Sequence, residues 1–328
     1  MLTNLKRLEG VESEGYRVTS TFVGGKANIW SGIRLFCQSF RFDAIIFSSE
    51  TRRLLIFCLL RTLLPFSQCV VLGVDYILQE PIGWRQRLLA RIKGRLLSKV
   101  DRFILHFVET SVYQKYYGIP RERCAFIPFK VNHFEVIASS QRTSSDGEYV
   151  FTAGRSFRDL PTFAQAMRHT GYPGLLLYED AEIMMQGGTK VDLGSLPENL
   201  KAIKNPSEQS WVDYIAQAKV VVVPLLPASG YAPGLSLYLM AMAMKKCVII
   251  TEGPSTSGLL TNEAIIIPPG NYLAMASAMK RAWEDDDFRE QVAAAGQHYA
   301  RTLGGEMRLY RDLVEICGSL VFEKRQTP

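Results

Sequence analysis

Short runs of apolar residues recur along the second half of the chain and alternate with stretches of helical character. The clearest run is 220–223, four consecutive valines that end at Pro224. Uninterrupted apolar runs are typical of parallel strands buried on both faces, so this alternation predicts an α/β sheet covered by helices. Ligands of such sheets bind beyond the carboxyl ends of the strands. The predicted strands are 149–153, 175–178, 200–204, 220–223, 247–251 and 265–267.

The first half shows the same alternation less clearly. Residues 5–8 have helical character where a Rossmann-like domain places its first strand. We therefore expect that the first domain either lacks its opening strand or begins at a displaced position. The predicted strands are 17–23, 43–47, 69–72, 103–105 and 125–127, with a helix at 51–64.

The stretch 139–148 is polar, rich in small residues and without periodicity, which is typical of an interdomain linker. We predict two Rossmann-like domains, at 1–138 and 149–328. The last helices of the chain either stay with the second domain or return to the first.

Composition excludes several classes of protein. Of the 328 residues 47% are hydrophobic and 21% are charged, so the chain can bury a large core. The 6 cysteines form no C-x-x-C pair and the 4 histidines show no ligand spacing, which disfavours a disulfide scaffold and a metal site. The run 54–60 is far shorter than the roughly 20 residues of a membrane span. The start of the chain has no signal-peptide pattern, so we expect a cytoplasmic protein.

Charge is unevenly distributed between the two halves. Residues 1–147 contain 21 Lys and Arg against 12 Asp and Glu, a net charge of +9, whereas residues 148–328 contain 17 against 20, a net charge of −3. This asymmetry indicates an anionic partner for the first half: a membrane surface, a nucleic acid or a phosphorylated substrate.

The loop after the predicted strand 149–153 carries the first candidate site. Gly154 permits a tight turn, and Arg155 and Arg158 can converge on a phosphate with bidentate donors. The alternative is a solvated loop in which Asp159 caps the next helix.

A second candidate follows the valine strand, where a loop containing glycine leads into a helix near Leu235. Gly234 and Leu235 would present free backbone N–H groups at the positive end of the helix dipole, and Ser236 would add a hydroxyl. The alternative is a plain turn with a serine cap. Neither G-x-x-x-x-G-K-[ST] nor G-x-G-x-x-G is present, which disfavours P-loop NTPases and dinucleotide enzymes.

Taken in order, these segments resemble the donor half of a GT-B glycosyltransferase of the retaining family 4. The resemblance covers about residues 95–300 and includes 98–104, 116–120 and 126–128 of the first half and 241–243 and 247–251 of the second. It implies two Rossmann-like domains that face a cleft, the first binding the acceptor and the second a nucleotide-sugar. The acceptor class would be lipid-linked or a polysaccharide, and the sugar would retain its anomeric configuration.

The resemblance also assigns roles to residues. Arg155, Arg158 and the helix end at Gly234, Leu235 and Ser236 would hold the donor diphosphate. The nucleotide base and ribose would lie near Asn205, Pro206 and Met240. No metal or cofactor is implied, because fixed cations and a helix end can stabilise the charge of the leaving group.

One departure affects the predicted activity. The two glutamates that the family places eight residues apart correspond to Ala232 and Met240. Either this is a divergent enzyme, in which Glu252 is a candidate substitute, or it is an inactive relative that binds a nucleotide or a partner. A nucleotide-sugar epimerase of similar architecture is a third possibility, disfavoured by the few histidines.

On the acceptor side the catalytic residues are not identified by the sequence. Asp75 follows the strand 69–72 and His106 follows 103–105, so both are candidates at the carboxyl edge of the first sheet. Each also fits a purely structural role.

A basic amphipathic helix around 84–99 is the third candidate. It holds six basic and no acidic residues, and Trp84, Leu88 and Ile92 recur at intervals of four. The apolar stripe either packs on the sheet or enters the headgroup region of an anionic membrane. No aromatic platform for nucleic acid is evident. The candidate membrane-contacting residues are Trp84, Arg85, Arg87, Arg91, Lys93, Arg95 and Lys99.

Overall fold

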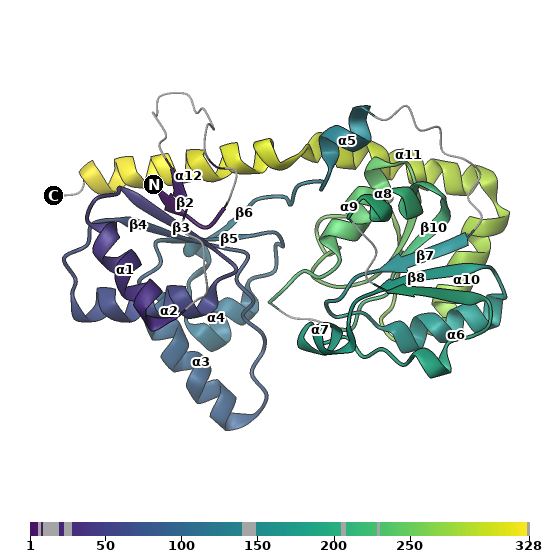
Figure 1. The fold of residues 1–328 in the computed structure, drawn as a ribbon, viewed down its shortest axis with the longest axis horizontal. Helices are drawn as coiled ribbons and strands as arrows, with labels where there is room; N and C mark the ends of the chain where they lie inside the picture. The colour runs from purple at the N-terminus through teal and green to yellow at the C-terminus, as the bar shows by residue number, and fades with distance from the viewer. Residues whose placement is uncertain are drawn as a thin grey trace. The chain divides into compact units, whose positions relative to one another are not determined.

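The computed structural model describes residues 1–5, 8, 20–22, 28–139, 149–204, 208–227 and 230–326 (Figure 1). The chain forms two compact units, each built around a parallel six-stranded sheet. The first unit comprises Met1–Pro128, Ser229–Tyr231 and Met307–Pro328, and the second comprises Phe129–Ala228 and Ala232–Glu306. The α/β class predicted from the alternating apolar runs is confirmed.

The first sheet has the strand order β2-β1-β3-β4-β5-β6. It does have an opening strand, β1, which pairs in parallel with β2 and β3 and which the sequence analysis did not predict. The strand is only two residues long, so it carries no periodic signal. Of the predicted helix 5–8, residues 5 and 8 are not helical and 6–7 lie outside the described residues, as do most of 17–23. The strands are Leu2–Thr3 (β1), Thr21–Phe22 (β2), Ala44–Ser48 (β3), Val70–Val74 (β4), Arg102–Leu105 (β5) and Cys124–Phe126 (β6).

Helices cover both faces of this sheet. One face carries α12, whose buried residues include Leu309, Leu313 and Cys317 and pack on β3, β4 and β5. On the other face, Phe57 of α2 contacts Phe36 of α1 and the sheet. The helices of this unit are Ile29–Ser39 (α1), Thr51–Leu63 (α2), Gly83–Leu97 (α3), Ser111–Tyr117 (α4), the short Arg121–Arg123 (η1) and Glu306–Gln326 (α12).

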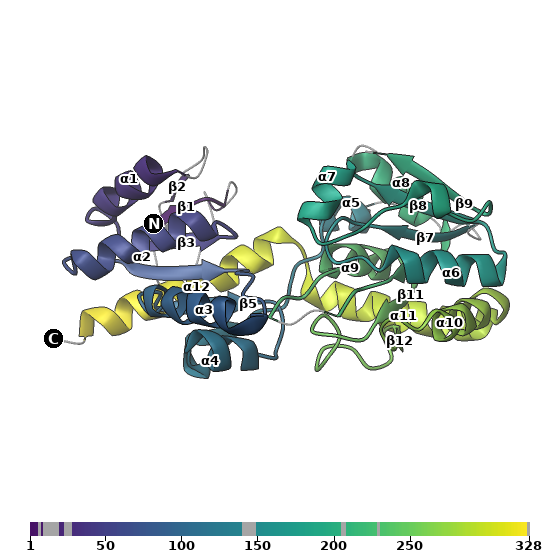
Figure 2. The same ribbon diagram turned by 90° about the horizontal axis from the view of Figure 1, so that it is seen from below.

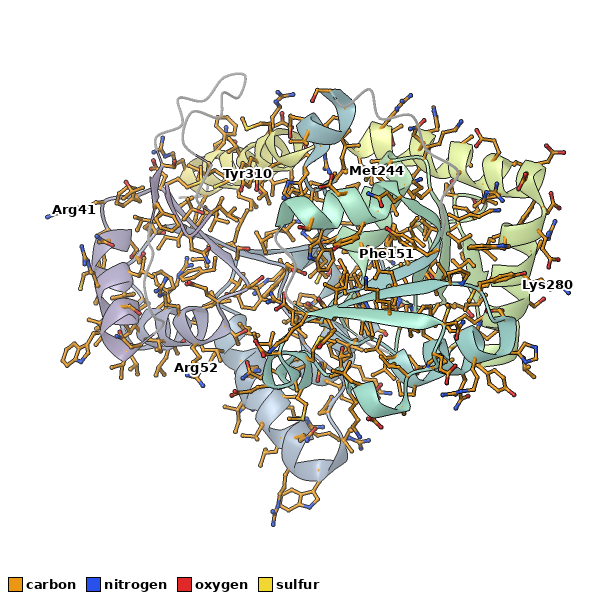
Figure 3. The ribbon with its side chains drawn as sticks, turned by 45° about the vertical axis from the view of Figure 1, so that its right-hand side comes forward. Arg41, Arg52, Phe151, Met244, Lys280 and Tyr310 are labelled. Atoms are coloured by element: carbon orange, nitrogen blue, oxygen red, sulfur yellow. The ribbon has the colours of Figure 1, made fainter. Side chains whose placement is uncertain are left out.

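The second sheet has the order β12-β11-β10-β7-β8-β9. Its core includes Val150, Val220, Val222 and Ile249, which pack against α6, α10 and α11. Phe151, labelled in Figure 3, is fully buried within this unit. The strands are Tyr149–Ala153 (β7), Gly174–Tyr178 (β8), Leu200–Lys204 (β9), Ala218–Val223 (β10), Cys247–Thr251 (β11) and Ile265–Ile267 (β12). The helices are Phe134–Ser139 (α5), Leu160–Thr170 (α6), Ala181–Gln186 (α7), Leu193–Ser195 (η2), Glu208–Ala216 (α8), Leu235–Ala243 (α9), Tyr272–Glu284 (α10) and Asp286–Leu303 (α11).

The division between the units falls after Pro128, ahead of the predicted linker 139–148. The residues just after it belong to the second unit because the N–H of Val131 donates to the carbonyl of Gly304 at 2.9 Å. Residues 140–148 lie outside the described residues. At the other end of the chain, α12 follows Gly304 and Gly305 and packs on the first unit.

Candidate functional site

The strand order of the second unit reverses between β7 and β10. From β7 the chain builds outward to β8 and β9, and then returns to add β10, β11 and β12 on the other side. Parallel sheets bind their ligands at such a reversal, because the loops after the two central strands leave in opposite directions and open a crevice. Both candidate loops of this half follow these strands, Gly154–Asp159 after β7 and the stretch from Pro224 to Gly234 after β10.

Hydrogen bonds tie these loops to one another. The N–H of Leu226 donates to the carbonyl of Phe157 at 2.9 Å, and the N–H of Asp159 donates to the carbonyl of Pro224 at 3.0 Å. The end of β11 joins them, since the hydroxyl of Thr251, its last residue, accepts from the N–H of Leu225 at 3.0 Å. The carboxyl ends of three strands therefore form one hydrogen-bonded rim.

Arg158 is part of the framework of this rim. Its side chain is 5% exposed, its Nε donates to the carbonyl of Ala153 at 2.9 Å and its Nη1 donates to the carbonyl of Ser156 at 2.7 Å. Gly154 has a φ of +113°, and a Cβ there would lie 2.3 Å from the Arg158 guanidinium. The expectation that both arginines reach toward a ligand therefore needs revision, because Arg158 donates to its own loop.

Arg155 has the opposite environment. It is exposed, and within the described part of the chain no hydrogen bond or ion pair involves its guanidinium. The carbonyl of Arg155 lies against Gly187, where a Cβ would approach it to 2.3 Å. The backbone of Arg155 is thus held closely while its side chain carries an unpaired positive charge at the rim. Asp159 caps α6, accepting from the N–H of Thr162 at 3.2 Å, as the alternative interpretation of this loop expected.

The N-terminus of α9 adds partial positive charge to the same edge of the sheet. Gly234 is the N-cap residue, with a φ of +90° that favours glycine, and no side chain caps the helix. Ser236 therefore does not serve as the cap, and it is exposed in the first turn. A hydrogen bond stabilises the turn before α9, because the Ser255 hydroxyl donates to the carbonyl of Pro233.

The two positions that correspond to the family's glutamates are buried. Ala232 and Met240 are each 4% exposed, and every residue of α9 except Ser236 is buried. A buried thioether does not suit the role of a ribose contact that the resemblance gave to Met240. Glu252 is exposed directly after β11. Asn205 and Pro206 lie outside the described residues.

In the first unit, Asp75 and His106 follow adjacent strands, β4 and β5. Asp75 has a φ of +53°, and its N–H donates to the carbonyl of Ile104 at 3.0 Å. His106 is 2% exposed, and its Nδ1 lies 2.8 Å from the carbonyl of Ile127, to which it donates. Burial raises the pKa of Asp75, and the positive charge of His106 acts in the opposite direction. The two groups are thus close enough to influence each other electrostatically.

A further polar cluster in this unit was missed by the sequence analysis. Asn4 follows β1 and forms two hydrogen bonds with the backbone of Ser48, the last residue of β3, at 2.8 Å each. Nearby, the fully buried Arg53 donates to both carboxylate oxygens of Glu50, at 2.7 and 3.0 Å. The strand order of this sheet reverses between β1 and β3, so these residues lie at its own switch point. They were missed because residues 5–8 were interpreted as a helix.

Among the described residues there is no group of three or more His, Cys, Asp or Glu side chains placed to hold a metal ion. At the rim of the second sheet, the exposed Arg155 side chain and the N-terminus of α9 both carry positive charge. Together these groups suit the binding of a diphosphate.

The burial of Met240 leads to a stability prediction. Met240→Glu would place an unpaired carboxylate in the interior, so we expect the free energy of unfolding to fall by several kcal/mol. Met240→Leu conserves volume and serves as the control, with an expected loss below about 1.5 kcal/mol. Chemical denaturation measures both. Equal stability of Met240→Glu and the wild type would show that this side chain reaches solvent.

Asp75 leads to a prediction about pH. Because burial raises the pKa of Asp75, the folded chain holds this proton more tightly than the unfolded chain does, and the free energy of unfolding falls as pH rises through the raised pKa. Asp75→Asn removes the titrating group and with it this fall in the free energy of unfolding, and asparagine tolerates the positive φ at this position. We expect the variant to melt at a higher temperature than the wild type at neutral pH. The difference in melting temperature between the variant and the wild type should shrink at pH values below the ordinary pKa of aspartate, near 3.9. A difference in melting temperature that does not depend on pH would contradict the prediction.

Comparison with known proteins identifies the fold. No family model matches the sequence, and no curated protein matches it at a significant level. Three solved structures are similar throughout most of their length. HepE of Anabaena, in complex with UDP and glucose, is 12% identical with a TM-score of 0.67 and is matched over 88% of this chain and 81% of its own. A glycosyltransferase of Rickettsia africae is 12% identical with a TM-score of 0.66, over 95% and 86%. Sucrose-phosphate synthase of Thermosynechococcus elongatus is 14% identical with a TM-score of 0.67, over 89% and 77%. The chain therefore has the GT-B fold of these glycosyltransferases.

Proposed function

We propose that this protein transfers a sugar from a nucleotide-sugar donor to an acceptor. The observation that carries the proposal is the unpaired Arg155 guanidinium on the rim that also carries the uncapped N-terminus of α9. A nucleoside diphosphate gains negative charge as its bond to the sugar breaks, and fixed positive charges stabilise that change. The GT-B fold supports the proposal, and HepE, one of the similar structures, was solved with UDP and with UDP-glucose.

In this proposal the chain's own residues divide the work. Arg155 pairs with the diphosphate, the N–H groups at Leu235 and Ser236 bind its oxygens, and Arg158 keeps the loop in place. Asp75 and His106 serve the acceptor side, where a carboxylate with a raised pKa next to an imidazole suits proton transfer. We further propose retention of configuration, and an acceptor that is lipid-linked or a polysaccharide.

A second candidate function is binding of a nucleotide or a partner without turnover. The specific observation in its favour is that Ala232 and Met240 replace the two glutamates of the resembled family. Their loss removes charge-assisted hydrogen bonds, each of which contributes about 1.5–3 kcal/mol.

A ligand panel distinguishes the two functions. Thermal unfolding is measured with nucleoside diphosphates and with nucleotide-sugars, because a ligand at 100 times its Kd stabilises the folded state by about 2.7 kcal/mol. Release of nucleoside diphosphate from the stabilising nucleotide-sugar, accelerated by an acceptor extract, would establish transfer. Stabilisation without release across donors and acceptors would establish the binding protein, and no stabilisation by any nucleotide would refute both.

The two arginines are expected to give different signatures. Arg155→Ala should weaken nucleoside diphosphate binding by about 1.5–3 kcal/mol with an unchanged melting temperature, because an exposed charge-assisted pair is lost. The parent nucleoside, which lacks phosphates, should bind both proteins alike. Arg158→Ala should instead lower the melting temperature, because it removes the two hydrogen bonds from its guanidinium to the carbonyls of Ala153 and Ser156. Calorimetry and thermal unfolding measure these effects, and equal diphosphate affinity of Arg155→Ala and the wild type would refute the assignment.

A further inference from the structure

Helix α3 turns its large apolar side chains away from its own unit. Its buried residues are Ala90, Gly94 and Leu97, and it approaches α4 so closely that a Cβ on Gly94 would lie 1.8 Å from the carbonyl oxygen of Tyr117. Figure 1 shows α3 extending away from the sheet of the first unit. The large apolar side chains of this segment are instead exposed: Ile82 (83%), Trp84 (71%), Leu88 (52%), Leu89 (63%) and Ile92 (49%).

The direction of this stripe follows from helical geometry. At about 100° per residue, Trp84, Leu88 and Ile92 form a stripe on the side of α3 opposite to Ala90 and Gly94. Of the two interpretations of this stripe, packing on the sheet is therefore excluded. The stripe is left without a partner within the described residues of the unit.

Positive charge runs beside the apolar stripe. Arg87, Arg91 and Arg95 share the same spacing of four residues and are all exposed. No acidic residue occurs between 81 and 100, and no ion pair joins these three arginines to any acidic group of the described chain. The Arg85 guanidinium lies 5.4 Å from the centre of the Trp84 ring. An apolar stripe bordered by unpaired arginines matches the boundary between headgroups and acyl chains of a bilayer.

The neighbouring helices α1 and α2 of the first unit also expose basic and large apolar side chains. Helix α2 packs against both α1 and α3, and Figure 2 shows α1 and α2 side by side. Arg41, which points outward in Figure 3, and Arg34 and Arg52 are exposed on this part of the unit. Large exposed apolar side chains accompany them: Ile29, Trp30, Phe40, Leu59, Leu63, Leu64 and Phe66.

We propose that α3, assisted by α1 and α2, is the surface by which this protein binds an anionic phospholipid bilayer. The apolar stripe enters the interface, and the arginines contact lipid phosphates. No helix in the described part of the chain is long and apolar enough to cross a membrane. Charge complementarity selects an anionic lipid over a neutral one, because each Lys or Arg near an anionic surface strengthens binding about fivefold, and salt screens this attraction. The inference does not depend on the proposed glycosyl transfer.

Co-sedimentation of the full chain with vesicles tests the proposal. We expect binding to vesicles of phosphatidylcholine and phosphatidylglycerol in equal parts, little binding to pure phosphatidylcholine, and weaker binding at high salt. Tryptophan fluorescence should shift to shorter wavelength on binding, and Trp84→Ser should reduce that shift. Absence of binding to the anionic vesicles at low salt, or equal binding to both kinds of vesicle, would overturn the proposal.

Matched variants locate the surface. Reversal of Arg87, Arg91 and Arg95 to Glu should weaken vesicle binding at least about 100-fold. The same charge change on exposed residues of the second unit, Lys201, Lys280 and Arg301 to Glu, should weaken it far less. All six positions are exposed, so thermal unfolding is expected to show intact folding. If the two triple variants lost vesicle binding to the same extent, α3 would not be the membrane-binding surface.

The apolar part of the surface is tested separately. Trp84→Ser combined with Leu88→Ser should weaken vesicle binding at least about tenfold while nucleotide binding stays unchanged. The alternative occupant of the stripe is a second copy of the chain. A dimer in light scattering that this double variant converts to a monomer, without vesicle binding by the wild type, would overturn the proposal.

Discussion

The hydrogen bonds from the buried Arg158 guanidinium to the carbonyls of Ala153 and Ser156 hold the loop on which the proposed donor site depends. They satisfy one backbone acceptor at the end of β7 and one in the loop that follows it. They also require glycine at position 154, because the guanidinium occupies the space that a Cβ would take. The neighbouring Arg155 is then carried by a fixed backbone with its side chain in solvent. Arg158 thus fixes the backbone of the loop, and Arg155 presents its positive charge to the solvent.

The rim of the second sheet is preorganised without any ligand. The loops after β7 and β10 and the end of β11 are joined through Phe157, Leu225 and Thr251, and the turn before α9 is supported by Ser255. A site of this kind loses little entropy when it binds, because its donors are already oriented. Its positive charge comes from one exposed side chain and one helix end, which suits a multiply charged anion.

The two units differ in what they expose. The second unit buries nearly all of α9, whereas the first unit leaves apolar side chains on α1, α2 and α3 in solvent together with unpaired arginines. Contiguous exposed apolar side chains mark surfaces that bind another molecule or a membrane. Their combination with basic residues distinguishes the surface of the first unit from that of the second.

The α/β class and eleven of the twelve strands in the described part of the chain were predictable from the sequence, because buried parallel strands such as 220–223 are runs of apolar residues whose pattern is local. The glycine–arginine loop and the glycine before α9 were also visible, since turns impose their own residue types. The opening strand β1 was not visible, because two residues carry no period and are strands only by pairing with β2 and β3. Arg155 and Arg158 look equivalent in sequence, and only the packing of the loop against β7 and β10 buries one and exposes the other. The same holds for α3, whose amphipathic pattern predicts a stripe, whereas the close contact of Gly94 with Tyr117 determines which face of the helix is left in solvent.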